Sequence, residues 1–225
     1  VASQNVYKIT SYVKVTTEML KFFNNIRANI DNRLVYLVQE KADDYLLTGT
    51  GSSQPMGVTE NAQPLDNVGL YGTIPGLDAD VTIWDCAGAM ISQVYTEAYG
   101  PIQRGAFVMH PTDVYKMVYG SKSSTYEYVY PVTVTPTGVS IGGFPVIQDT
   151  GITAGYMLFG DFSKFYIAEA GGLEIKMGYD GNDFTENKVT ILGEKLFASY
   201  VMNNDYNFFV YDAIADMKVF LSTGS

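Results

Sequence analysis

Residues 24–57 read NNIRANIDNRLVYLVQEKADDYLLTGTGSSQPMG, and apolar side chains return in this segment every three or four positions. Such spacing is typical of a helix with one apolar stripe. The stripe consists of Ile26, Ile30, Leu34, Leu37, Val38, Ala42, Tyr45 and Leu46. It predicts a helix over 26–47, roughly 33 Å long at about 1.5 Å per residue. We expect Asn24 or Asn25 to cap its start, and Gly49 to end it in the left-handed conformation.

A Gly/Ser-rich turn and a Pro-x-Gly sequence follow the predicted helix, with Gly49, Gly51, Pro55 and Gly57 as the fixed points. The two closely spaced glycines do not form a phosphate loop, because no Gly-Lys-Ser/Thr follows them. They also follow a helix, whereas a dinucleotide-binding fingerprint follows a strand. The two glycines are therefore not interpreted as a nucleotide-binding motif.

The composition is that of a globular protein with a large core: 225 residues, 47% hydrophobic and 17% charged. The net charge of -10 argues against sequence-specific DNA binding, which needs many Lys and Arg contacts to phosphate. It argues equally against docking on an anionic membrane. No apolar run approaches the ~20 residues of a membrane span.

Few residues of the chain are suited to catalysis or metal binding. The one cysteine, Cys86, lies in an apolar helical pattern, so we expect it to be buried and inert. The one histidine, His110, precedes Pro111, where we expect it to bond the backbone at the start of a helix. There is no Gly-x-Ser-x-Gly nucleophile elbow and no His/Cys cluster for a metal. Whether Cys86 lies beside His110, as a Cys-His pair requires, the sequence leaves open.

Further elements are predicted along the rest of the chain. Helices are expected at 16–23 with a Thr cap, at 80–100 with Asp80 or Thr82 as cap, and from 111 onward. Residues 155–161 and 164–168 are expected to pair as two strands around a turn. The other expected strands are 6–15, 106–109, 126–134, 142–147, 173–177, 189–203, 208–211 and 216–221.

Five blocks in this order resemble the tailed-bacteriophage major capsid proteins of the HK97 fold. The first joins Asn32-Arg33-Leu34 of the long "spine" helix to Leu46-Leu47-x-Gly49-x-Gly51 and Pro55-x-Gly57. The second is Phe107-Val108-Met109-His110-Pro111, in which His110 stands where the family more often has Asn before Pro. The other blocks are Gly143-Phe144-Pro145-Val146, Leu158-Phe159-Gly160-Asp161-Phe162 and Thr190-Ile191-Leu192-Gly193-Glu194-Lys195.

This resemblance implies an α+β, HK97-like capsid fold with a long spine helix, a peripheral (P) domain and an axial (A) domain. Residues 1–48 would hold the end of an extended loop, the E-loop, and the spine helix, as the first part of the P domain. Residues 49–165 would form the A domain, and 166–225 the second part of the P domain. The N-terminal arm and most of the E-loop would be absent from this chain.

The function implied is that of a major capsid protein, a self-assembling subunit of an icosahedral phage head around double-stranded DNA. Its partners would be identical copies in pentamers and hexamers, with scaffold, protease and portal proteins, and it would need no cofactor. It would be assembled in the host bacterial cytoplasm and located in the virion. Two alternatives stay open: an encapsulin, the shell protein of a bacterial nanocompartment, and an α+β enzyme or ligand-binding domain that resembles these blocks by coincidence.

Some relatives of this family join subunits through a Lys-Asn isopeptide bond assisted by a glutamate. By position, Asn187 matches the acceptor and Glu194 the assisting residue. The alternative is that Asn187 is a turn residue and that Glu194 pairs with Lys195 or another neighbour. The segments 121–138 and 179–188 are expected at symmetry axes. Their candidate contact residues are Tyr126, Tyr128, Tyr130, Thr137, Tyr179, Asp180, Asn182 and Asp183.

Overall fold

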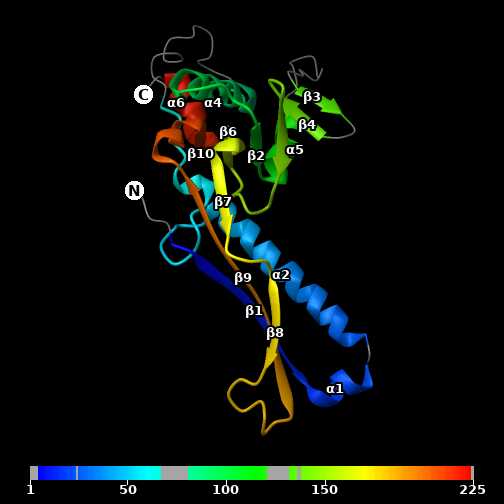
Figure 1. Cartoon of the computed structure of the whole chain (residues 1–225). Helices are drawn as coiled ribbons and strands as arrows, with labels where there is room; N and C mark the ends of the chain where they lie inside the picture. The colour runs from blue at the N-terminus through cyan, green and yellow to red at the C-terminus, as the bar shows by residue number, and fades with distance from the viewer. Residues whose placement is uncertain (1–4, 24, 67–80, 121–131, 136–137, 224–225) are drawn as a thin grey trace. The chain divides into compact units, whose positions relative to one another are not determined.

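The computed structural model describes residues 5–23, 25–66, 81–120, 132–135 and 138–223 (Figure 1). The chain divides into two compact units. Unit 1 consists of Val1–Gly57 and Ile167–Tyr200, and unit 2 of Val58–Tyr166 and Val201–Ser225. Each unit is therefore built from segments far apart in the sequence.

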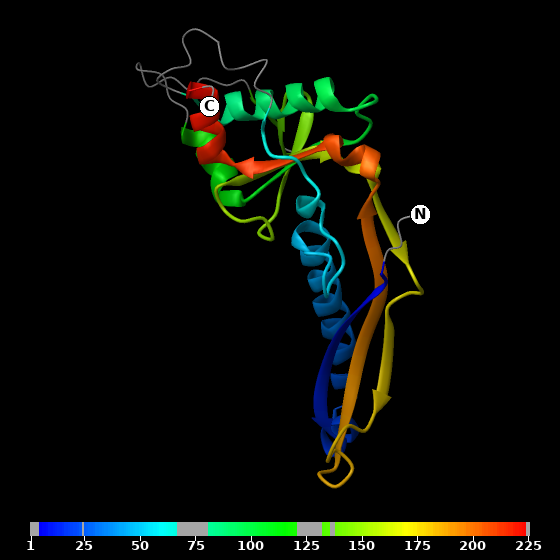
Figure 2. The ribbon, with the colours of Figure 1, turned by 90° about the vertical axis from the view of Figure 1, so that its left-hand side faces the viewer.

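Unit 1 is built around the long strand β9 (Lys188–Val201). All of strand β1 (Tyr7–Thr16) pairs antiparallel with β9, from Tyr7 opposite Phe197 to Thr16 opposite Lys188. Strands β7 (Phe165–Glu169) and β8 (Glu174–Gly178) both pair with β9 in the same four-stranded sheet. Figure 2 shows them one after the other along β9, on the side away from β1.

Helix α2 (Ile26–Thr48) covers one face of this sheet and confirms the predicted helix. Its buried residues are Leu34, Val38 and Ala42, the middle of the predicted stripe. Leu34 packs with Val15 and Ile191, and Val38 and Ala42 pack with Ile9 and Phe197. Odd-numbered residues of β9 thus face the helix, and even-numbered ones face the other way, because side chains alternate along a strand. We call this second side the outer face of the sheet.

The two ends of α2 differ from the prediction. Asn25 is at the cap position, but its side chain makes no capping hydrogen bond. Gly49 ends the helix with φ -65° and ψ 137°, which is an extended conformation and not the left-handed one. Glycine is needed there for another reason: a Cβ on Gly49 would lie 2.0 Å from the carbonyl oxygen of Pro55. The backbone N–H of Gly57 donates to the Gly49 carbonyl at 2.7 Å, so the turn closes by direct backbone contact.

The short helix α1 (Thr17–Phe22) joins β1 to α2. As predicted, the hydroxyl of Thr16 caps it by accepting a hydrogen bond from the backbone N–H of Met19. Leu20 packs into the cluster of Val15, Leu34 and Ile191. Helix α1 therefore lies on the same side of the sheet as α2.

Unit 2 holds a six-stranded sheet in the order β10-β6-β2-β5-β4-β3. The strands are β2 (Gly105–Met109), β3 (Val132–Thr135), β4 (Gly138–Ile141), β5 (Phe144–Gln148), β6 (Tyr156–Asp161) and β10 (Phe209–Ala213). Pair β2–β5 is parallel, and the other neighbours are antiparallel. The centre of the sheet is fully buried, with the rings of Phe107 and Phe159 4.4 Å apart.

Three helices complete unit 2: α4 (Ile83–Glu97), α5 (Pro111–Gly120) and α6 (Ile214–Thr223). Helix α4 begins with a capping box between Thr82 and Asp85, which selects Thr82 of the two predicted caps. It ends at Glu97, before the predicted stop at Gly100. Short 3₁₀ turns lie at Val58–Glu60, Phe162–Lys164 and Asn203–Phe208.

Three predictions about the second half of the chain are wrong. Residues 216–221 form part of helix α6 instead of a strand, and Ile214, Met217 and Leu221 are buried at helical spacing. Strands β6 and β7 belong to different sheets, because β2 and β10 already occupy both edges of β6. Residues 201–225, expected with the spine helix, lie in unit 2, because β10 pairs with β6.

Candidate intersubunit surface

The loop between β8 and β9, residues 179–187, is exposed apart from one residue, Asp183. The Asp183 carboxylate accepts hydrogen bonds from the backbone N–H of Asp180 at 2.9 Å and from the Thr190 hydroxyl. It also pairs with the Lys14 ammonium at 3.0 Å. The Asp183 carbonyl accepts from the Lys188 N–H at 2.8 Å. One buried carboxylate therefore ties the loop to β1 through Lys14 and to β9 through Thr190.

These contacts shift the pKa of Asp183. The hydrogen bond from Thr190 lowers it first, and the Asp180 N–H and the Lys14 charge lower it further, to about 2. Burial acts in the opposite direction but is outweighed. The loop is thus held by a carboxylate that stays ionised in any ordinary buffer.

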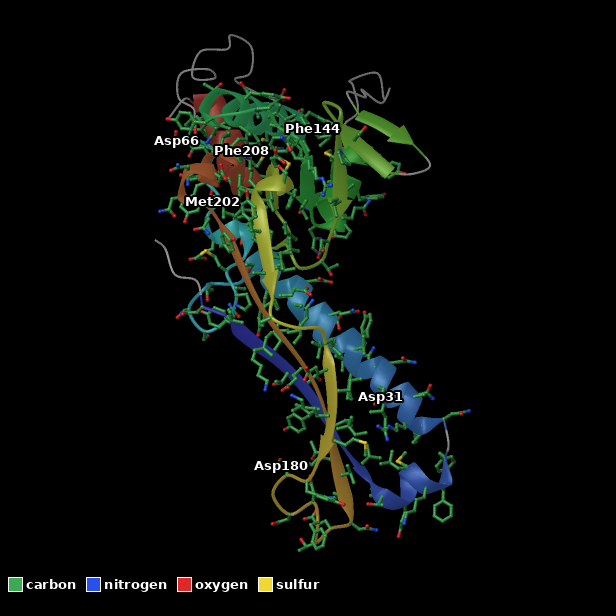
Figure 3. All side chains as sticks on the ribbon, in the orientation of Figure 1. Asp31, Asp66, Phe144, Asp180, Met202 and Phe208 are labelled. Carbon is green, nitrogen blue, oxygen red and sulfur yellow. The ribbon has the colours of Figure 1, made fainter. Side chains whose placement is uncertain are left out.

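The ordered loop presents two aromatic side chains to solvent. Tyr179 and Phe184 are 65% and 77% exposed, and their rings meet edge to face with centroids 5.7 Å apart. Asp180, between them in sequence, is marked in Figure 3 at the free end of the β8–β9 hairpin. Exposed aromatic side chains on a fixed backbone are typical of contact surfaces, because little conformational entropy is lost on binding.

Glu194, on the outer face of the sheet, is a buried carboxylate between two lysines. It is 4% exposed and pairs with Lys8 of β1 and Lys176 of β8, and Lys176 also pairs with Glu174 at 3.0 Å. Lys176 and then Lys8 lower the pKa of Glu194. The ion pairs link three strands across this face.

Glu194 does form ion pairs, as the second interpretation predicts, but its partners are Lys8 and Lys176 and not Lys195, and its assisting role in a crosslink stays a prediction. Lys195 points to the opposite side of the strand and pairs with Glu169 at 2.7 Å. The sequence offered one signal for the true partners. Lys8, Thr10, Tyr12 and Lys14 of β1 recur at every second position, with Ile9 and Val13 among the residues between them, which marks them as one polar face.

A hollow of about 200 Å³ lies on the outer face between the two groups of ion pairs. Its lining residues are Lys176, Met177, Gly178, Tyr179, Asp180, Thr190 and Leu192. Leu192 and Thr190 of β9 point to this face, while Lys176 and Asp180 place opposite charges at it. The exposed ring of Tyr12 stands on β1 opposite Leu192.

Helix α1 carries a second exposed apolar group at the same end of unit 1 (Figure 2). Met19, Phe22 and Phe23 are 44%, 80% and 61% exposed. The start of α1 is joined to the end of the loop, because the Asn187 carbonyl accepts from the Thr17 N–H at 2.9 Å. Sequence reasoning did not single out these α1 residues.

Asn187, the candidate crosslink acceptor, occupies a left-handed turn position with φ 54°. This is a conformation that Asn tolerates better than most residues. Seven positions separate it from Glu194, so roughly 23 Å lies between their Cα atoms at about 3.3 Å per strand residue. Within one subunit the two side chains therefore do not form a common site.

The remaining predicted contact residues divide into three groups. Tyr179, Asp180 and Asn182 are exposed on the loop, whereas Asp183 is buried and positions it. Tyr126, Tyr128, Tyr130 and Thr137 lie outside the described residues.

The residues considered for catalysis have ordinary structural surroundings. Nδ1 of His110 accepts from the Thr112 N–H at 3.2 Å, the predicted backbone bond at a helix start. Cys86 is fully buried, as predicted, and burial raises the pKa of its thiol to about 12. Within the described ranges, no three His, Cys, Asp or Glu side chains gather closely enough to hold a metal ion. None of the described helices combines the length and apolar character needed to cross a membrane.

Comparison with known proteins identifies one family. The model of the phage capsid family matches residues 1–209. No curated protein gives a significant match.

Solved structures share the fold at low sequence identity. A capsid of an empty GTA particle is 17% identical, with a TM-score of 0.69 over 92% of this chain and 73% of the other. A structure from Gordonia phage Cozz is 19% identical, with a TM-score of 0.62 over 92% and 70%. The SrpI encapsulin of Synechococcus elongatus PCC 7942 is 14% identical, with a TM-score of 0.62 over 93% and 74%. The HK97-like fold is therefore shared by phage capsids and an encapsulin, and the match to the family model favours the phage capsid.

Proposed function

Because the chain belongs to the phage capsid family and is a major capsid structural protein, we propose that its copies form pentamers and hexamers that close into an icosahedral shell around double-stranded DNA. The observation that carries this proposal is the family match over residues 1–209. In this proposal unit 1 is the peripheral domain and unit 2 the axial domain.

The exposed side chains of unit 1 suit repeated contacts between identical copies. A ring closes when each subunit offers two unlike surfaces that fit the next copy. The aromatic pair Tyr179 and Phe184 and the exposed side chains of α1 are two such unlike surfaces. We place the loop 179–187 at a contact between subunits, with Asp183 as its internal support.

The charge of the chain suits a container for DNA. A net charge of -10 lets the shell enclose the polymer without the phosphate contacts that would hold it in place. Scaffold, protease and portal proteins would act during assembly in the host bacterial cytoplasm, and the finished subunit would reside in the virion.

Electron microscopy of the full-length protein tests the proposal. We expect hollow, closed particles of uniform diameter, alone or with the scaffold and protease. Particles from infected or induced cells should contain DNA, whereas an enzyme cargo without DNA would support the encapsulin alternative. A protein that stays strictly monomeric under all these conditions would contradict the shell.

A further inference from the structure

We propose that the ring of Phe22 inserts into the hollow on the outer face of a second copy, so that α1 of one subunit is held by the β8–β9 hairpin of the next. This inference rests on the proposed function, because it needs copies packed in a shell. The two surfaces belong to the same end of unit 1.

The size and chemistry of the two surfaces match. A cavity of about 150 Å³ is large enough to hold a benzene ring, and the hollow measures about 200 Å³. Leu192 points into it from β9, and Tyr179 borders it. Phe22 is 80% exposed and lies on the same face of α1 as Met19, three positions earlier, so one helix turn presents both.

The flanking charges are also complementary. Helix α1 carries Glu18 and Lys21 three positions apart, along one side of the face that Met19 and Phe22 form, and both are exposed, without an ion pair among the described residues. The hollow is bordered by Lys176 and Asp180, one of each sign. Opposite charges around an apolar contact fix its orientation more than they strengthen it.

The contact must join two copies. Leu20 packs α1 into the core on the α2 side of the sheet. The hollow lies on the outer face, where the side chains of Thr190 and Leu192 point. A subunit therefore has the ring on one side of its sheet and the hollow on the other, and the contact repeats head to tail from copy to copy.

Disulfide trapping in assembled particles tests the contact directly. Particles of the double variant Phe22→Cys with Tyr179→Cys should form at reduced yield, because the ring is lost, but the particles that do form should give a ladder of covalent oligomers on a non-reducing gel. Particles of each single variant should give none. The native Cys86 does not interfere, because it is buried and its thiol pKa is raised to about 12. Double-variant protein that has not assembled should give no ladder, because the ring and the hollow meet only between copies.

Two single changes test the same contact without new cysteines. Phe22→Ser should lower particle yield at least tenfold, whereas Phe23→Ser, a matched change at the neighbouring exposed ring, should leave it close to wild type. Leu192→Trp should also lower the yield, by filling the hollow. Before assembly, the subunits of all three variants should have melting temperatures within a few degrees of wild type. A lower particle yield would then come from the lost contact and not from an unfolded subunit.

The outcomes distinguish this inference from the proposed function. Failure of the wild-type protein to form particles contradicts the shell itself. Intact particles of the double-cysteine variant without a ladder, together with normal assembly of Phe22→Ser, overturn the contact while leaving the shell in place.

Discussion

Gly49 and Gly57 bring the two ends of the turn after α2 into backbone contact. A Cβ on Gly57 would lie 2.4 Å from the backbone nitrogen of Gly49 and 2.5 Å from the carbonyl oxygen of Leu47. Backbone atoms cannot rotate away as a side chain can. Gly57→Ala should therefore destabilise unit 1 by roughly 1–3 kcal/mol, measured by denaturant unfolding.

Gly88→Ala is the matched control for this change. Gly88 is exposed inside helix α4, and no atom lies within 4 Å of an added Cβ. Alanine there should raise stability by about 1 kcal/mol, because glycine is a poor helix former. Equal losses at both positions would show that the backbone contact at Gly57 is not the cause.

Asp183 gives the loop 179–187 a defined dependence on pH. Its folded pKa of about 2 lies below its ordinary value of 3.8. The stability that it contributes is therefore fully present above pH 3.8 and is lost as the pH falls through 2. Asp183→Asn should lower the melting temperature at pH 7, and the difference from wild type should shrink as the pH is taken from 5 towards 2. A difference independent of pH would argue against an ionised Asp183 as the support of the loop.

Single residues show where sequence reasoning stopped. The positions of Asn187 and Glu194 could be selected from the sequence, but not the partners of Glu194, because Lys8 is 186 positions earlier and reaches it only across the sheet. A neighbour in sequence such as Lys195 is excluded by the alternation of a strand. Exposure of Phe22 was not predictable either, because Leu20 and Phe22 are equally apolar and only packing separates them.

At the scale of elements, helix α2 offers a test of the buried face. Leu34 is 2% exposed between Val15 and Ile191, so Leu34→Asp places an unpaired carboxylate in the core at a cost of several kcal/mol. Little or no soluble folded protein is expected. Arg33→Ala should cost much less, because Arg33 is exposed and lies over the ring of Tyr36 at 5.1 Å. The two variants are compared by circular dichroism and by the yield of soluble protein. Similar damage from both would mean that Leu34 does not lie on the buried face of the helix.

The two residues proposed for a covalent crosslink between subunits lie in the β8–β9 loop and in strand β9. If the assembled protein gives a ladder that resists denaturation and reduction, Asn187→Asp should abolish it, since a carboxylate is a poor acyl donor to lysine. Glu194→Ala should slow its formation by removing a base. A ladder that persists in Asn187→Asp particles would leave Asn187 the role its φ of 54° already explains, that of a turn residue.

The elements also show which parts of the fold were predictable. Helix α2 and strand β1 were predictable, because each buries one face and its apolar residues recur at the spacing of a helix or a strand. The assignment of β7 to the other sheet was not, because a strand pattern does not say which edge is vacant. The sequence of 216–221 predicts a strand wrongly because six apolar-rich residues fit the two-residue period of a strand as well as the 3.6-residue period of a helix. In the structure the segment is helical and packs against α4.

At the scale of the whole molecule, the exposed aromatic pair should matter for assembly and not for folding. Tyr179 and Phe184 contact each other, but their rings remain largely in solvent. The double variant Tyr179→Ser with Phe184→Ser should keep the melting temperature of the unassembled subunit within a few degrees and reduce particle yield severalfold. Light scattering and electron microscopy measure the yield, and wild-type yield from this variant would remove the loop from the contact surface.

The pairing of β1 with β9 also sets the order in which the subunit is completed during synthesis. Thr16 pairs with Lys188, about 170 residues later, and ribosomes add about 5–20 residues per second. Strand β1 therefore waits roughly 10–35 s for its partner. Until then Thr190 and Leu192, which line the hollow from β9, are missing, so the hollow that we propose as a docking site does not exist. The hairpin side of the proposed contact can therefore form only after strand β9 has been synthesised, whereas Phe22 of the opposite side has been part of the chain from early on.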